Sequence, residues 1–188
     1  VSSGSKLTER QRNYHNYTKN RDLAIITLLL GTGIRVSECV GIGISDIDFY
    51  NNSINIIRKG GNESIIYFGE EVKNALEIYY NERIEKSPNP GHEEAFFLSM
   101  QNRRITPRTI QKLVKKYASL VTKFKKISPH KLRSTYGTNL YKETQDIYLV
   151  ATVLGHKNVN TTKKYYAAID EDRKKSAINY IKLKNNEN

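Results

Sequence analysis

The sequence predicts a mainly helical α+β domain with a small antiparallel three-stranded sheet. Three observations support this fold class: apolar residues recur at helical spacing along most of the chain, two short Ile-rich segments flank a Gly-Gly turn, and 38% of the 188 residues are hydrophobic, enough to form a core. The longest nearly uninterrupted apolar stretch, residues 23–34, is shorter than the roughly 18 residues that a membrane span needs. We therefore expect no membrane-spanning helix.

In the first half of the chain, residues 7–17 are polar and predict a short first helix that acts as an entry segment. Residues 20–30 are apolar almost all round and predict a separate buried helix that stops at residues 31–33, Gly-Thr-Gly. Residues 53–58 and 63–68 predict two strands joined by a turn at 59–62, and residues 44–49 offer a third strand. Residues 70–86 predict a helix that ends before the Pro/Gly loop at 88–91.

In the second half, Thr106 and Pro107 read as the N-cap and first residue of a helix. Apolar residues at spacings of three and four then predict an amphipathic helix to residue 120, with a basic outer face. Further helices are expected at residues 130–141, 146–154, 160–168 and 171–183, with breaks near 142–144 and at Gly155.

The charge is strongly uneven. The chain has 31 Lys and Arg against 19 Asp and Glu, a net charge of +12, and no acidic residue lies between Glu94 and Glu143. That segment contains twelve basic residues, so the other Lys and Arg only balance the acidic residues: Arg103, Arg104, Arg108, Lys112, Lys115, Lys116, Lys123, Lys125, Lys126, Lys131, Arg133 and Lys142. A concentrated positive charge favours a nucleic acid as partner, with a solvated basic face or a membrane-surface patch as the alternatives.

The single cysteine and the start of the chain bear on the cellular compartment and on the extent of the chain. Cys39 has no partner for an internal disulfide, which suits the reducing cytoplasm. His130, His156 and Cys39 have no metal-ligand spacing, so a metal nuclease is disfavoured. Residues 1–6 contain neither an initiator Met nor an apolar signal core, and we expect them to lie inside a longer chain.

Five short segments contain an unusual set of charged and nucleophilic residues, in a fixed order. They are Arg35 and Glu38 after Gly31-Thr-Gly33, Lys59 in the hairpin turn, His130 and Arg133 in His-Lys-Leu-Arg, His156 in Leu-Gly-His, and the pair Tyr165 and Tyr166. Read together, these segments resemble the tyrosine recombinase, or phage integrase, family.

The resemblance implies a domain organisation. Residues 20–168 correspond to the catalytic domain, residues 1–19 to a linker and entry segment, and residues 169–188 to a C-terminal helix and tail able to dock on a neighbouring protomer. The N-terminal core-binding domain of the family is absent from this chain, so we expect weak and poorly sequence-specific DNA binding by the chain alone. Packing of residues 169–183 on their own domain is the alternative to docking.

The same resemblance assigns roles, and the chemistry agrees with them. Phosphoryl transfer without a metal needs fixed cations aimed at the non-bridging oxygens, and Arg35 and Arg133 suit this because a guanidinium grips two oxygens at once. Glu38 would share a helical face with Arg35 and hold its guanidinium; a first-turn Glu favoured by the helix dipole is the alternative.

Lys59 and the two histidines complete the implied site. By resemblance Lys59 is the general acid that protonates the leaving 5′ oxygen, the alternative being a solvated lysine beside Arg58 as the real contact. His130 is expected to act as a base or phosphate contact rather than a structural histidine. His156 is expected to donate to a non-bridging oxygen rather than cap a helix.

The implied nucleophile is a tyrosine nine residues after the second histidine, which is Tyr165. Tyr166 would face about 100° away on a helix and serve as a packing or DNA-facing neighbour. An alternative is that both tyrosines simply pack. Two departures from the family pattern, Ser134 in place of a second histidine and the Lys-Gly-Gly-Asn turn, leave the turn register around Lys59 open.

Function follows as an expectation from the resemblance. The chain is expected to cut and rejoin double-stranded DNA through a 3′-phosphotyrosyl intermediate, as a homotetramer on two duplexes, with neither cofactor nor metal. The expected DNA contacts are Arg103, Arg104, Arg108, Lys112 and Lys131. Type IB topoisomerase-like relaxation and DNA binding without catalysis are the alternatives.

Overall fold

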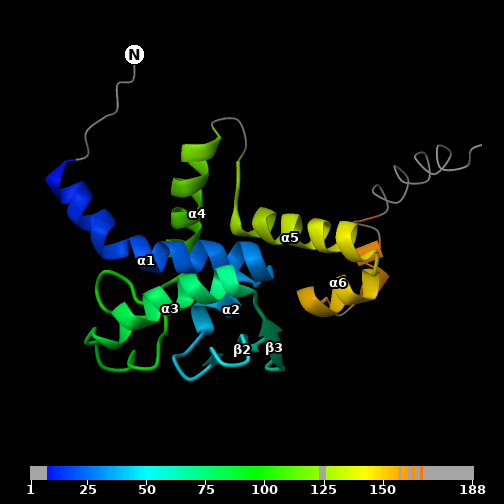
Figure 1. The fold of residues 1–188 in the computed structure, drawn as a ribbon, viewed down its shortest axis with the longest axis horizontal. Coiled ribbons are helices and arrows are strands. Elements are labelled where there is room, and N and C mark those ends of the chain that lie inside the picture. The colour runs from blue at the N-terminus through cyan, green and yellow to red at the C-terminus, as the bar shows by residue number, and fades with distance from the viewer. Residues whose placement is uncertain (1–7, 123–125, 157, 161, 164–165, 167–188) are drawn as a thin grey trace, which may run out of the picture. The chain divides into compact units, whose positions relative to one another are not determined.

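The computed structural model describes residues 8–122, 126–156, 158–160, 162–163 and 166 of the chain (Figure 1). The chain divides into two compact units, Val1–Tyr136 and Gly137–Asn188, and the boundary falls within the fifth helix. The described elements are mainly helical with one three-stranded antiparallel sheet, which confirms the predicted fold class.

The first helix is longer than predicted. Helix α1 (Glu9–Thr32) runs without the break expected between residues 17 and 20, so the expected separate entry helix is wrong. The physical reason is that the polar residues of this stretch find partners: the Thr18 hydroxyl donates to the carbonyl of Tyr14 at 3.0 Å and is fully buried. Because these side chains are satisfied within the helix or in the core, they do not interrupt it.

The sheet follows a short helix, α2 (Val36–Gly41). Strands β1 (Ile47–Asp48), β2 (Ser53–Ile57) and β3 (Glu63–Tyr67) pair in that order, all antiparallel, with Ile54 opposite Ile66. The third strand exists but has only two residues of the expected 44–49. Along β2, Ile54 and Ile56 are buried while Asn55 and Ile57 are exposed, so one face of the hairpin contributes to the core.

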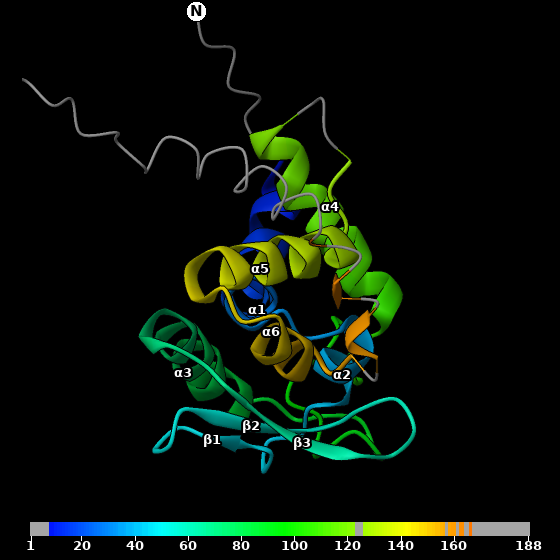
Figure 2. The same cartoon turned by 90° about the vertical axis from the view of Figure 1, so that its right-hand side faces the viewer.

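Two helices cover the rest of this core. Helix α3 (Glu70–Ile84) lies above the sheet in Figure 2 and contacts α1 along its length. Helix α4 (Pro107–Val121) begins at the predicted N-cap, where the Thr106 hydroxyl accepts from the Thr109 amide at 3.3 Å. It buries Ile110, Leu113 and Val114, which confirms the amphipathic prediction.

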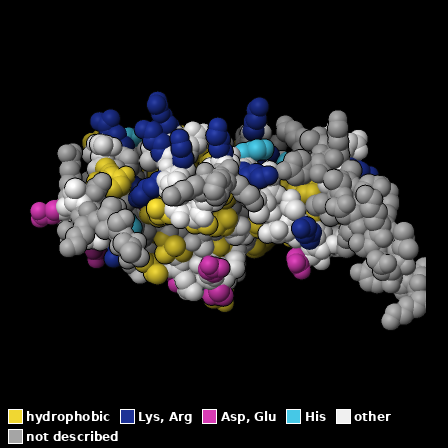
Figure 3. All heavy atoms as spheres, turned by 90° about the horizontal axis from the view of Figure 1, so that it is seen from above, with side chains coloured by type: hydrophobic (Ala, Val, Ile, Leu, Met, Phe, Trp, Pro, Cys, Tyr) yellow, Lys and Arg dark blue, Asp and Glu magenta, His cyan; other side chains and the backbone are white. Residues whose placement is uncertain are grey.

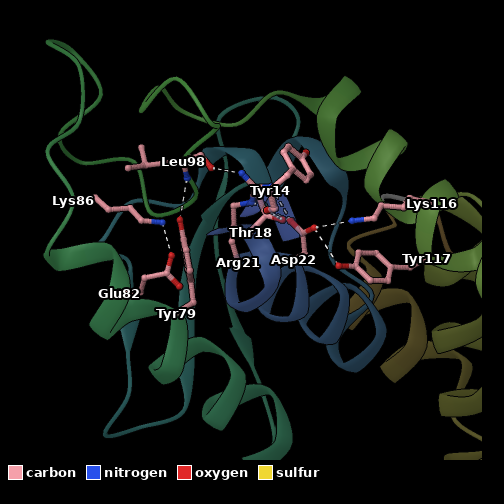
Figure 4. Close-up of polar contacts among 10 residues, drawn as sticks. All are labelled: Tyr14, Thr18, Arg21, Asp22, Tyr79, Glu82, Lys86, Leu98, Lys116 and Tyr117. Atoms are coloured by element: carbon pink, nitrogen blue, oxygen red, sulfur yellow. Dashed lines mark hydrogen bonds and ion pairs between the residues drawn. The ribbon is translucent and has the colours of Figure 1, made fainter. Parts of the chain in front are cut away.

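A buried polar network links α1, α3 and α4 (Figure 4). The Arg21 guanidinium pairs with Asp22 at 2.7 Å and donates to the carbonyl of Leu98 at 2.9 Å. The amide of Leu98 donates to the Tyr79 hydroxyl at 3.2 Å, and the Tyr117 hydroxyl donates to Asp22 at 3.2 Å. A buried charge pair is tolerated only when its polar atoms are satisfied, and these contacts satisfy them.

Helix α5 (Pro129–Thr144) continues through the break expected at 142–144. In the second unit, α6 (Ile147–Leu154) is capped by the Asp146 carboxylate, which accepts from the amides of Tyr148 and Leu149. It ends at Gly155 in the left-handed conformation, φ 58°, as predicted. The expected helix at 160–168 lies partly, and that at 171–183 wholly, outside the described residues. No helix in the described part of the chain is long and apolar enough to cross a membrane.

Candidate active site

Arg35 is positioned by the turn that ends α1. Gly33 takes a left-handed conformation, φ 63°, and its amide donates back to the carbonyl of Leu29 at 3.2 Å. The chain then turns through the buried Ile34, and Arg35 becomes the N-cap of α2. This geometry explains the Gly-Thr-Gly sequence, since a residue with a side chain would be strained at position 33.

Glu38 holds Arg35 as expected. Its carboxylate accepts from the Arg35 guanidinium at 2.7 Å and from the Arg35 backbone amide at 2.9 Å. The Glu38 side chain is 2% exposed, whereas the Arg35 side chain is 33% exposed. The guanidinium is therefore fixed on its protein side by a buried charge and keeps a solvent-facing side that a phosphate can reach.

Arg133 reaches the same turn from α5. Its Nη1 donates to the carbonyl of Gly33 at 2.6 Å, and the residue is 8% exposed. Gly33 lies two residues before Arg35, so the turn that holds the Arg133 guanidinium also leads into the N-cap of α2 at Arg35. His130, three residues before Arg133 on α5, is exposed.

Lys59 lies at the exposed tip of the β2–β3 hairpin. The turn is closed by the Arg58 amide, which donates to the carbonyl of Asn62 at 2.8 Å, and by the Gly61 amide, which donates to the carbonyl of Arg58 at 3.0 Å. Gly60 and Gly61 both have positive φ, 99° and 81°, which this tight turn requires. Lys59 is thus the second residue after strand β2, which ends at Ile57.

In the second unit, the described residues place His156 and Tyr166. His156 follows Gly155, and its Nδ1 lies 2.8 Å from the hydroxyl oxygen of the fully buried Thr162, a contact that orients the ring. Tyr165 lies outside the described residues.

Tyr166 is a packing residue. It is 2% exposed, its ring lies 5.2 Å from that of Tyr141, and its hydroxyl would be only 2.3 Å from a Cβ at Gly137. A side chain held so tightly in the interior has no access to an external phosphate. This burial agrees with the packing role expected for Tyr166.

Four of the five residues expected to contact DNA are exposed at the surface. Arg103, Arg108, Lys112 and Lys131 are exposed, and Figure 3 shows Lys and Arg side chains projecting along one edge of the face in view. Arg104 is different, because its Nη1 donates to the carbonyls of Val40, Gly41 and Ile42 at 2.8–2.9 Å. It thereby caps carbonyls at the end of α2, and its expected contact with DNA stays a prediction.

Arg58 is the residue that sequence reasoning underrated, since it entered only as an alternative to Lys59. Arg58 directly follows strand β2, which ends at Ile57, and is partly buried. Its Nη1 atom is buried.

Among the described residues, no group of three or more His, Cys, Asp or Glu side chains is arranged to hold a metal ion.

Comparisons with known proteins identify the family of this chain. The profile of the phage integrase family matches residues 6–173. The tyrosine recombinase XerS of Lactococcus lactis subsp. cremoris (strain MG1363) is 36% identical over 89% of this chain and 48% of its own. The chain belongs to the phage integrase family, and it spans about half the length of the curated relatives it matches.

Solved structures show the same fold. The XerA recombinase has a TM-score of 0.75 and 25% identity, over 98% of this chain and 68% of its own. The Tn1549 transposon integrase, in complex with circular intermediate DNA, has a TM-score of 0.61 and 27% identity, over 88% of this chain and 62% of its own.

Proposed function

We propose that this chain is the catalytic domain of a site-specific tyrosine recombinase that integrates or excises a mobile element or phage. It cuts and rejoins double-stranded DNA by transesterification through a 3′-phosphotyrosyl intermediate. Family membership supports the reaction class. The observation that carries the proposal is the turn at Gly33, which anchors Arg133 through its carbonyl and presents Arg35 two residues later.

Two guanidiniums at one turn fit the electrostatics of phosphoryl transfer. Negative charge on the non-bridging oxygens is stabilised by cations that are already in place, because no reorganisation is then needed during the reaction. Arg35 is fixed by Glu38 and Arg133 by the Gly33 carbonyl. We assign both to the non-bridging oxygens, with His156 as a further donor oriented by Thr162.

The proposed step conserves atoms and charge. The Tyr165 oxygen attacks phosphorus and its proton passes to His130, while the bond from phosphorus to the 5′ oxygen breaks and Lys59 protonates that oxygen. A 5′ hydroxyl from a partner strand reverses the step and releases the tyrosine. The phosphotyrosyl link retains the bond energy, so the exchange itself requires no nucleotide cofactor.

The choice of Tyr165 over Tyr166 is supported by the burial of Tyr166. The Tyr166 ring packs on Tyr141, and its hydroxyl points at Gly137. A hydroxyl enclosed in this way cannot attack an external phosphate, which supports the other tyrosine of the pair as the nucleophile.

DNA is the proposed partner, contacted by the exposed Arg103, Arg108, Lys112 and Lys131. Each phosphate neutralised by a Lys or Arg releases counterions, so binding must weaken steeply with salt. The related Tn1549 integrase is described in complex with DNA, which supports the same partner here. The protein would act in the cytoplasm, where the buried Cys39 thiol stays reduced.

We also propose that the chain works as a homotetramer on two duplexes, with residues 169–188 docking on a neighbouring protomer. Deleting everything after Ala168 should then reduce assembly on DNA, measured by analytical ultracentrifugation, while DNA binding by single protomers persists. Unchanged assembly would contradict docking in trans.

The experiment is covalent trapping on DNA. The protein is incubated with a pool of nicked duplexes whose central sequence is randomised, so that cleavage releases a short fragment and cannot reverse, and adducts are resolved on a denaturing gel. Wild type and Tyr166→Phe should form an adduct, and Tyr165→Phe should form none. Absence of an adduct from wild type would refute catalysis and leave DNA binding alone.

A further inference from the structure

The Arg104 guanidinium holds the end of α2 from a loop that lies 62–64 residues further along the chain. Its Nη1 atom donates to the carbonyls of Val40, Gly41 and Ile42 at 2.8, 2.8 and 2.9 Å. The last carbonyls of a helix have no partner within the helix, and a positive charge beside them also complements the helix dipole. One side chain therefore caps the carboxyl end of α2.

The backbone from which this side chain extends is itself fixed. Arg104 forms an isolated antiparallel bridge with Leu98, and the next amide, that of Ile105, donates to the carbonyl of Phe97 at 2.9 Å. Leu98, Ile105 and Phe97 are each 1% exposed. Because these buried neighbours anchor its backbone in the core, the Arg104 side chain can hold α2 rather than follow it.

The opposite end of α2 carries the phosphate site. Arg35 is the N-cap, the Cys39 amide donates to its carbonyl at 2.9 Å, and the Glu38 carboxylate accepts from its guanidinium and its amide. Helix α2 has only six residues, fewer than two turns, and a helix this short is not stable by itself. Cys39 is fully buried and seats the middle of the helix on the core, while Glu38 and Arg104 secure its two ends.

We propose that Arg104 is a positioning residue for Arg35. By capping α2 it keeps the Arg35–Glu38 pair in place, so that the Arg35 guanidinium stays aimed at a non-bridging oxygen of the cleaved phosphate. This inference rests on the proposed function, because it needs Arg35 at that oxygen. The role is exerted through the backbone of α2 and changes the rate of cleavage, whereas the DNA contact expected for Arg104 would change the affinity for DNA.

The test compares two DNA substrates that differ in the charge of one phosphate. The duplex and its cleaved phosphate are taken from the trapped adducts, and in the second version a methyl group replaces one non-bridging oxygen, which removes the negative charge. Arg35→Gln should lose about 100-fold or more in cleavage of the ordinary substrate, the usual cost of removing one group that stabilises this charge. It should recover on the uncharged substrate, whereas Lys59→Ala should be slow on both because the leaving oxygen is the same.

Arg104→Gln should follow the pattern of Arg35→Gln. Its rate at saturating DNA should fall about tenfold or more on the ordinary substrate, because small displacements of a catalytic group are costly, and recover on the uncharged one. Adding Gly41→Ala should restore part of the rate, since a Cβ at Gly41 would clash with none of the described residues and alanine favours a helix more than glycine does. Lys73→Gln, which removes one charge on α3, should cleave as wild type.

Binding measurements separate this role from a direct DNA contact. Arg103→Gln, at an exposed neighbour expected to contact DNA, should weaken binding and lower by about one the slope of log affinity against log salt. The inference is overturned if Arg104→Gln behaves like Arg103→Gln in binding and cleaves at the normal rate once DNA is saturating, or if its loss of rate persists on the uncharged substrate. If Arg35→Gln is not slowed, the assignment of Arg35 to the phosphate fails instead.

A second measurement needs no DNA and tests the link through α2 even if no cleavage is detected. Hydrogen exchange of the Arg35 and Cys39 amides reports opening of α2, because the first donates to Glu38 and the second to the Arg35 carbonyl. Arg104→Gln should raise exchange at both amides about tenfold, the effect expected from loss of a charged hydrogen bond, while amides of α3 stay unchanged. Unchanged exchange at Arg35 and Cys39, or an equal rise in α3, would contradict positioning through α2.

Discussion

Replacing Gly137 by alanine tests the packing of Tyr166. An added Cβ would lie 2.3 Å from the Tyr166 hydroxyl oxygen and 2.8 Å from Cδ1 of Leu154, both far inside van der Waals contact. Because the Tyr166 ring is buried against Tyr141, it cannot simply swing into solvent. Overpacking of this kind costs about 1–3 kcal/mol, so Gly137→Ala should destabilise the folded state by an amount in that range.

A double-mutant cycle isolates the contact. Tyr166→Phe removes the hydroxyl, after which the nearest Tyr166 atom to the new Cβ is Cζ at 3.6 Å, an ordinary contact. The double variant should therefore be more stable than the sum of the single changes predicts, with a coupling of about 1 kcal/mol or more. Urea unfolding of the four proteins, with the m-values compared, measures this coupling.

The cycle also has a functional readout. Covalent trapping of the four proteins shows whether Gly137→Ala lowers adduct formation by Tyr165, and whether adding Tyr166→Phe restores it. Additivity to within about 0.5 kcal/mol would refute the placement of the Tyr166 hydroxyl against Gly137, and with it the structural argument for Tyr165 as nucleophile.

Three further changes test other parts of the molecule. Thr106→Ala removes the oxygen that accepts from the Thr109 amide and should destabilise the fold by about 1 kcal/mol in urea unfolding, whereas Thr106→Asp, which keeps a capping oxygen, should not. Tyr79→Phe leaves the buried Leu98 amide without its acceptor and should cost about 1–3 kcal/mol; a cost near zero would mean that water replaces the hydroxyl. Burial raises the pKa of Cys39 to about 12, so the unfolded thiol ionises first as pH rises from about 9 and folded-state stability should fall up to about 12. Unfolding measured at both ends of this window should show a smaller fall for Cys39→Ala, and an equal fall would contradict the assignment.

Local patterns were sufficient to predict most helices and the hairpin. The Thr106-Pro107 start of α4 and the end of α6 at Gly155 depend on neighbouring residues alone, and the structure confirms both. The break expected in α1 between residues 17 and 20 was wrong, and Asn20 at its edge donates to the carboxylate of Glu82, which is 62 residues away in the chain. A tertiary partner of this kind leaves no local signal in a single sequence.

The same distinction applies to the site. The Arg35–Glu38 contact follows from a spacing of three residues, and the structure confirms it. The hydrogen bond from Arg133 to Gly33 joins residues 100 positions apart, so only the fold could reveal it. The hydrogen bonds of Arg104 were missed for a related reason, because the carbonyls that it caps come from a helix about 60 residues earlier in the chain.

The most direct test of the account is to identify the amino acid joined to DNA. Trapped adducts are digested with protease and nuclease, and the modified peptide is sequenced by mass spectrometry, together with the DNA end that it carries. The account predicts a nucleotide linked through its 3′ phosphate to Tyr165, with a free 5′ hydroxyl on the released strand. A modified Tyr166, a 5′ phosphate linkage or the absence of any modified tyrosine would contradict it.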